Sequence, residues 1–162
     1  MASAIGVRTE FIVEPGKQEL TIKQAFDAPR ERVFRLYTNP RLKPRWWGPR
    51  EITTKIDRMD VRRGGMWRHT QRDPQGKEYV FWGVYHDVVA PERIVDTFEW
   101  EGMPGHLSLE VTTFKEVDGK TEATTKVIFL SVEDRDGMVN SGMERGVRES
   151  GERFAELLAT EK

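Results

Sequence analysis

The first fifty residues alternate between a strand pattern and helical patterns. Leu20, Ile22, Gln24 and Phe26 lie at every second position, which predicts a β-strand after a loose lead-in over residues 1–17. Residues 29–39 then carry apolar positions at helical spacing and predict a helix, with Asp27 placed to cap it. A second short helix is predicted from residue 40 toward residue 47, where glycine and proline end it.

From residue 50 to residue 130 the period changes to two, which indicates a series of strands. Six segments follow one another, over residues 52–57, 66–71, 79–88, 93–100, 109–113 and 121–130. Tight turns separate them, and Asp118-Gly119 is the strongest hairpin signal in the chain. Short strands joined in this way predict an antiparallel meander.

The last segment, about residues 136–159, predicts one long helix. Its apolar face recurs at helical spacing and consists of Met143, Val147, Ser150, Phe154, Leu157 and Leu158. A helix of roughly 24 residues is about 36 Å long and can cross a small domain. We therefore expect an α+β fold over residues 18–160, a single domain in which a curved antiparallel sheet of about six or seven strands wraps around the C-terminal helix.

Composition narrows the class of protein. The 162 residues are 37% hydrophobic and 33% charged, and they include no cysteine, so disulfides, thiolate metal sites and cysteine nucleophiles are excluded. No apolar run reaches the roughly 20 residues of a membrane span, and the N-terminus does not follow a secretory-signal pattern. We expect a cytoplasmic protein. No metal or other cofactor is expected, because the histidines are far apart in the sequence and no phosphate-loop motif occurs.

Positive charge is concentrated in one region. Thirteen Lys/Arg and four Asp/Glu lie between Arg30 and Arg72, although the whole chain has a net charge of −1. Such a region could meet an acidic protein partner, whereas the charges are too dispersed to predict a nucleic-acid partner. The alternative is that these arginines are the solvated faces of a helix and several strands.

A series of short motifs runs through most of the chain. They are Phe26-Asp27-Ala28-Pro29 with Val33, Trp46-Trp47-Gly48-Pro49, Gly64-Gly65-Met66-Trp67, Asp73-Pro74-Gln75-Gly76, Gly83, Pro91-Glu92-Arg93-Ile94 with Thr97-Phe98, Gly119-Lys120-Thr121, and Gly142-Met143 with Gly146. In this order they resemble the START-like (SRPBCC) superfamily, in the branch of bacterial proteins similar to the C-terminal domain of the activator of the heat-shock-protein-90 ATPase. The resemblance covers about residues 20–158. It implies a helix-grip fold with a cavity between sheet and helix, in a superfamily of lipid carriers, hormone-binding proteins and cyclases.

Aromatic side chains are the main candidates for the walls of such a cavity. They either contact a flat apolar ligand or simply fill the core between sheet and helix. The predicted ligand-binding residues are Trp67, His69, Trp82, Phe98, Trp100, Val111, Phe129, Met143, Val147 and Phe154. In the third strand, charged Arg68 should face water, which turns Trp67 and His69 inward.

His69 is the candidate catalytic residue. An inward histidine could act as a general acid or base, and Asp96 could pair with it if that carboxylate also points inward. A hydrogen-bonded core histidine is the structural alternative.

Three hypotheses follow. The first is a protein that binds a small apolar, aromatic or lipid-like molecule. The second is an enzyme of the cyclase, dehydratase or hydrolase type that uses His69 in the same pocket. The third is an interaction module of the co-chaperone type, and a homodimer formed through an open sheet edge is compatible with each of them.

Overall fold

A single antiparallel sheet forms the frame of the protein. The computed structural model describes residues 7–161, and its eight strands lie in the order β1-β2-β8-β7-β6-β5-β4-β3. The strands are β1 (Arg8–Ile12), β2 (Glu19–Phe26), β3 (Thr53–Met59), β4 (Met66–Arg72), β5 (Glu78–Val89), β6 (Arg93–Trp100), β7 (Ser108–Val117) and β8 (Lys120–Phe129). The helices are α1 (Arg30–Thr38), the 3-10 turn η1 (Lys43–Arg45), α2 (Val132–Asn140) and α3 (Met143–Thr160).

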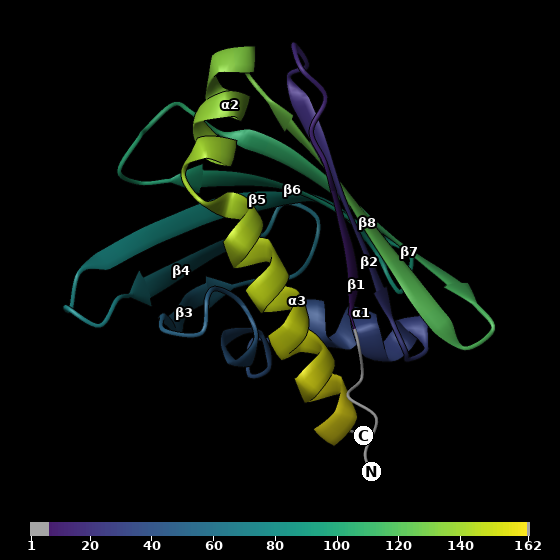
Figure 1. Ribbon diagram of the computed structural model, residues 1–162. Helices are drawn as coiled ribbons and strands as arrows, with labels where there is room; N and C mark the ends of the chain where they lie inside the picture. Colours follow the sequence, from purple (N-terminus) through teal and green to yellow (C-terminus); the bar gives the residue numbers. More distant parts are fainter. Residues whose placement is uncertain (1–6, 162) are drawn as a thin grey trace.

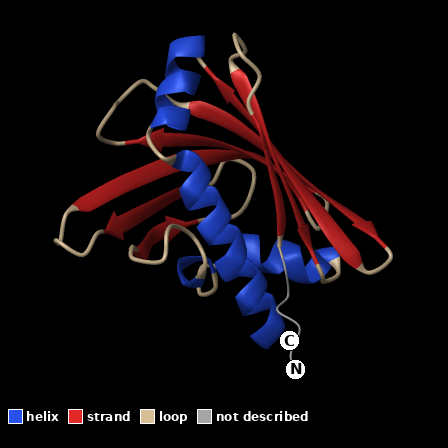
Figure 2. Cartoon of the chain, viewed as in Figure 1, coloured by secondary structure: helices blue, strands red, loops and turns tan. Residues whose placement is uncertain are grey.

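All helices lie on the inner side of the curved sheet. Figure 1 shows α3 crossing in front of the strands, with α2 above it and α1 behind and beside its lower part, and Figure 2 shows the same division into a helical layer and a strand layer. The predicted α+β helix-grip arrangement is therefore confirmed, with eight strands instead of six or seven.

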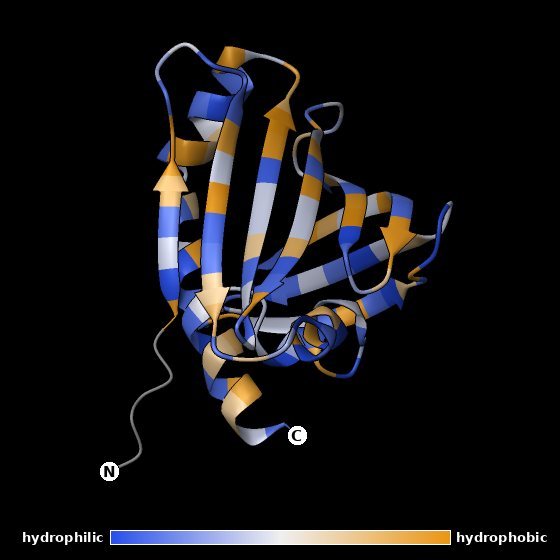
Figure 3. Ribbon diagram, turned by 90° about the vertical axis from the view of Figure 1, so that its right-hand side faces the viewer, coloured by the Kyte–Doolittle hydropathy of each residue, from blue (hydrophilic) through white to orange (hydrophobic). Residues whose placement is uncertain are grey.

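Alternating side chains build the core on the inner face. The residues of β2 alternate strictly between half-buried and buried positions, and the alternation of hydropathy along the strands is visible in Figure 3. Buried side chains from β2, α1, α3 and the two residues that flank η1, Leu42 and Trp46, meet in one cluster, in which the rings of Phe26 and Phe154 lie 4.5 Å apart. This cluster fixes the C-terminal half of α3 against the sheet.

The N-terminal segment differs from the prediction of a loose lead-in. Residues 8–12 form β1, which pairs antiparallel with β2 from Arg8 opposite Ala25 to Ile12 opposite Thr21. Along β1 exposed and half-buried positions alternate through Phe11. Backbone pairing with β2 gives it an edge-strand position, while residues 1–6 of the lead-in lie outside the described residues.

The predicted long C-terminal helix is two helices. Gly142 has φ 90°, a left-handed conformation that a helix interior does not allow, and it ends one helix and caps the next. α2 has its own N-cap, Ser131, whose hydroxyl accepts a hydrogen bond from the Asp134 amide at 3.0 Å. The helix that grips the sheet is therefore 18 residues long instead of about 24.

Two further details of the helices were predicted wrongly. α1 starts after Pro29 with no side-chain cap, so Asp27 does not cap it. The second short helix is only the three-residue turn η1, because Pro44 lies within it and Gly48 follows with a positive φ.

Close approach of β5 and β6 depends on Gly83. A Cβ atom at this position would lie 1.8 Å from the Thr97 carbonyl oxygen and 2.6 Å from Trp67 Nε1. Gly83→Ala should therefore lower the free energy of unfolding by about 2–3 kcal/mol, because backbone has to move to make room. Urea denaturation measures this change.

Gly137, in α2, is the matched control because a Cβ there meets nothing within 4 Å. Gly137→Ala should raise the free energy of unfolding by about 0.5–1 kcal/mol through helix propensity. Equal effects of the two substitutions would contradict this account of Gly83.

Candidate functional site

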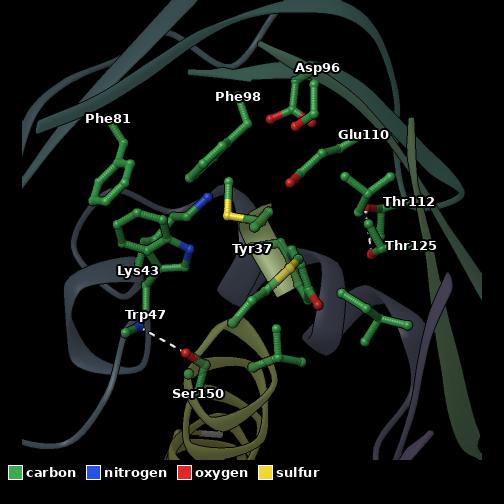
Figure 4. Close-up of a pocket in the computed structure, with 18 of the residues that line it drawn as sticks. Tyr37, Lys43, Trp47, Phe81, Asp96, Phe98, Glu110, Thr112, Thr125 and Ser150 are labelled. Atoms are coloured by element: carbon green, nitrogen blue, oxygen red, sulfur yellow. Dashed lines mark hydrogen bonds between the residues drawn. The ribbon is translucent and has the colours of Figure 1, made fainter. Parts of the chain in front are cut away.

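A cavity of about 420 Å³ separates the inner face of the sheet from the helices. Figure 4 shows side chains from strands, η1 and α3 pointing into it. Its lining comprises Ile22, Gln24, Tyr37, Lys43, Trp46, Trp47, Gly48, Pro49, Gln71, Phe81, Tyr85, Ile94, Asp96, Phe98, Ser108, Glu110, Thr112, Thr125, Val127, Phe129, Met138, Ser141, Gly142, Met143, Gly146, Val147 and Ser150. Ser141 and Gly142 are also exposed to solvent, so the junction of α2 and α3 lies at the mouth.

The structure brings four of the predicted wall residues to the cavity. These are Phe98, Phe129, Met143 and Val147, from β6, β8 and α3. Three others are core residues that do not line it: Trp67 and His69 pack on each other with ring centroids 4.6 Å apart, and Phe154 is 1% exposed.

Three predicted wall residues lie elsewhere. Val111 lies between Glu110 and Thr112, which line the cavity, so it faces the outer side of β7. Trp82 likewise faces outward from β5, where its Nε1 donates to Glu99 Oε2 at 3.3 Å. Trp100 shares the inward side of β6 with Phe98 but is not part of the lining and packs near Tyr79.

The predicted wall residues do not include the charged part of the lining. Asp96 of β6 and Glu110 of β7 are direct partners in the sheet register, and both carboxylates point into the cavity (Figure 4). Alternation could have revealed them, because Asp96 is two residues from Phe98 and Glu110 lies between Ser108 and Thr112. The sequence analysis considers an inward Asp96 only as a pairing partner of His69, and it does not place Glu110.

Enclosure of these acids changes their ionisation. Burial raises the pKa of Asp96 well above its usual value, the neighbouring Glu110 raises it further, and Lys43 and the Trp67 indole oppose the change. Burial also raises the pKa of Glu110, against the attraction of Lys43. Both carboxyl groups therefore favour the protonated form more than they would in water.

Lys43 brings a positive charge to the other side of the cavity. η1 directs its ammonium group toward three indoles, with Nζ 5.8 Å from the Trp46 and Trp67 ring centroids and 6.0 Å from that of Trp47. Burial lowers the pKa of Lys43, although the two carboxylates oppose this. The contacts with the indole faces partly replace the lost hydration of the ammonium group.

Some of the other polar lining groups have partners within the chain. Thr112 and Thr125 share a hydrogen bond at 2.9 Å, and Ser150 Oγ accepts one from the Gly48 amide at 2.8 Å. Among the described residues, Asp96, Glu110 and Lys43 form no ion pair within 4.0 Å, and the hydrogen-bonding group that acts on Asp96 is the Trp67 indole N–H. The three charged groups thus line the cavity without a direct ionic partner.

His69 does not have the surroundings of a general acid or base. It is completely buried, and neither ring nitrogen has a hydrogen-bond partner among the described residues. Burial, with a contribution from Lys43, lowers its pKa to about 2. Asp96 does point inward, as considered from the sequence, but no hydrogen bond or ion pair joins it to His69.

Much of the positive charge between Arg30 and Arg72 is paired within the chain. Each of five arginines has a carboxylate within 4.0 Å: Arg45, Arg50, Arg62, Arg68 and Arg72. These contacts reduce the charge that is free to attract an acidic partner. They match the alternative in which the arginines are solvated faces of the fold.

The described residues contain neither a membrane-spanning helix nor a metal-binding group. No helix in residues 7–161 is long and apolar enough to cross a membrane. Within the same residues, no three His, Asp or Glu side chains are grouped so that they could hold a metal ion.

Together the fold and the cavity define the class of a helix-grip protein with an internal pocket. The family model "Activator of Hsp90 ATPase homolog 1-like protein" matches residues 27–159, so the chain belongs to this family, within the START-like superfamily that its motifs resemble. The fold of this superfamily is commonly a ligand-binding fold. A comparison with curated proteins gives no match.

Solved structures of bacterial proteins share the fold over nearly their whole length. A solution structure of a protein from Arthrobacter aurescens is 23% identical, with a TM-score of 0.86 over 93% of this chain and 91% of that one. A crystal structure of a protein from Mycobacterium smegmatis is 26% identical, with a TM-score of 0.82 over 94% and 97% of the two chains. One from Rhodobacter sphaeroides is 22% identical, with a TM-score of 0.85 over 95% and 98%.

The state of His69 can be tested by NMR. Because burial disfavours its charged form, the imidazole should keep the chemical shifts of the neutral ring down to about pH 4. A pH titration of histidine-labelled protein, with His69→Phe to assign the signal, measures this. Titration near the ordinary histidine pKa of about 6.5 would show instead that water or a partner reaches the ring.

The ionisation of Asp96 predicts a pH-dependent effect on stability. Its folded-state pKa is raised, so its contribution to stability is full below the unfolded pKa and is lost as pH rises through the folded pKa. Asp96→Asn should therefore be similar to the wild type near pH 4 and more stable than the wild type near pH 8. Chemical denaturation of the ligand-free protein across this range measures the difference.

Glu156→Gln serves as the control of opposite sign. Glu156 is exposed and its hydrogen bond with Arg50 lowers its pKa, so its contribution is present above the unfolded pKa. Loss of that ion pair should make this variant slightly less stable near pH 8. An Asp96→Asn variant that is also less stable near pH 8 would refute the effect assigned to burial.

Proposed function

We propose that the protein binds a small, largely apolar or aromatic molecule in the cavity between sheet and C-terminal helix. The observation that carries this proposal is the cavity itself: its volume of about 420 Å³ lies within the usual range of ligand sites. A protein core of this size is normally packed without such a space.

The composition of the walls supports the same function. Trp47, Phe81 and Phe98 form an aromatic side, and the rings of Phe81 and Phe98 stack with centroids 5.2 Å apart. Met143 and Val147 add flexible and branched apolar surface from α3. Such walls bury a flat ring well, while a few polar groups at the other end fix its orientation.

The enzyme hypothesis has less support. It required a titrating His69, and this side chain is buried behind the lining with a lowered pKa. Ligand binding is therefore the function that we propose. We also propose a cytoplasmic location, which rests on the composition of the sequence.

Closing the cavity tests the proposal. N-phenyl-1-naphthylamine is a neutral aromatic probe whose fluorescence rises in apolar surroundings, and it should bind to the wild-type protein. Val147→Trp places an indole in the cavity from α3 and should weaken probe binding by about tenfold or more, because the ring occupies the ligand's space.

Val111→Trp is the matched control, since it adds the same indole on the outer face of β7. It should leave the affinity unchanged, with circular dichroism verifying that both variants are folded. No probe binding to the wild type, or equal binding to both variants, would refute the proposal.

A further inference from the structure

The pairing of Asp96 with Glu110 is an unusual arrangement for the inside of a protein. Residues that face each other across an antiparallel pair have Cβ atoms about 4.5–5.5 Å apart, and like charges there repel. Neither carboxylate has an ion pair within 4.0 Å in the described part of the chain, and only the neutral Trp67 indole N–H acts on Asp96 as a donor. Two acidic side chains thus face one space from neighbouring strands, and the protein supplies no direct cationic partner for either.

Lys43, which carries the positive charge of the cavity, is not a direct ion-pair partner of either carboxylate. Lys43 comes from η1 on the opposite side, and its Nζ forms no ion pair within 4.0 Å among the described residues. It lies instead over the indoles of Trp46, Trp47 and Trp67. One ammonium group against two carboxylates also leaves a formal balance of −1 when all three are ionised.

The aromatic walls, like the two carboxylates, favour a positively charged ligand. Phe98 follows Asp96 by two residues on β6 and therefore lines the same face, with Phe81 stacked on it. The faces of aromatic rings carry partial negative charge and attract cations. Carboxylates beside aromatic faces are the combination that binds a protonated amine through charge-assisted hydrogen bonds and cation–π contacts.

Two other occupants fit less well. An anionic ligand held by Lys43 would bring its charge into a cavity that already contains two carboxylates. A metal ion would require more ligands than two carboxylates, and no third His, Asp or Glu is grouped with them in residues 7–161.

We propose that the ligand of this cavity carries a protonated amine, which Asp96 and Glu110 receive together, while its aromatic or apolar body lies against Trp47, Phe81 and Phe98. This assignment rests on the proposed binding function and adds a chemical class to it. The ammonium group supplies the cationic partner that both carboxylates lack, and the body of the ligand occupies the aromatic side of the same space.

A matched series of probes tests the assignment. 1-Naphthylmethylamine, 1-naphthylmethanol and 1-naphthoic acid share one ring system and differ in charge. Isothermal titration calorimetry at neutral pH, where the amine is protonated, should give an amine affinity about tenfold or more above that of the alcohol. The acid should bind most weakly.

Variants locate the effect. Asp96→Asn and Glu110→Gln should each weaken binding of the amine and leave that of the alcohol within about twofold, since only the charged contact is removed. Glu99→Gln makes the same change of charge on β6, but Glu99 faces the outer side, where it accepts the Trp82 hydrogen bond. This control should keep the full preference for the amine.

The outcomes separate this inference from the function on which it rests. If the alcohol binds as well as the amine, or the acid binds best, the pocket is confirmed as a ligand site and the amine assignment is overturned. A preference for the amine that persists in Asp96→Asn and Glu110→Gln overturns it as well. Should none of the three probes bind the wild type, both the function and the ligand class are refuted.

Discussion

The facing carboxylates of Asp96 and Glu110 impose a constraint that the rest of the site accommodates. Two acids placed opposite each other on the inner face of a sheet cannot be covered by apolar side chains without a large cost in desolvation. The structure leaves a cavity beside them instead of packing α3 directly onto β6 and β7. It also places Lys43 on the far side, where its charge lowers their repulsion without forming a direct ion pair.

α3 and α2 are each anchored to the rest of the fold, at opposite ends of the cavity. The lower part of α3 is fixed by Phe154, which packs on Phe26 and Trp46 in the core. Above the cavity, α2 is held by the buried Arg135, whose Nη1 donates to the carbonyls of Glu14 and Glu19 at 2.8 and 3.1 Å. Between these two anchored helices lies the left-handed Gly142 at the cavity mouth, so the change of helix direction falls where a ligand would enter.

Much of the fold could be predicted from the sequence, because it follows from periodicity. Alternation identified seven of the eight strands, β2 and β3 to β8, in nearly their observed positions. The order of the motifs indicated the helix-grip class. The edge strand β1 was missed, because its five residues are too short a pattern to distinguish from a loop without the pairing with β2. The break at Gly142 was missed because apolar spacing continues through it while only the backbone conformation changes.

The site was harder to predict because the rule that apolar residues face inward does not hold for the polar lining of a pocket. Val111 was placed inside on its hydrophobicity, yet its neighbours Glu110 and Thr112 are the inward residues of β7. The same rule placed Trp67 and Phe154 correctly in the interior but could not distinguish a residue that fills the core from one that borders empty space. Only the register of β6 with β7 shows that Asp96 and Glu110 face each other, and sequence periodicity does not give that register.

A crystal structure of the protein with 1-naphthylmethylamine would test the central claim most directly. The account predicts the amine nitrogen within about 3 Å of carboxylate oxygens of both Asp96 and Glu110, and the naphthalene ring against Phe81 and Phe98. A complex in which the nitrogen points to the mouth at Gly142, or in which the ring binds outside the cavity, would contradict it.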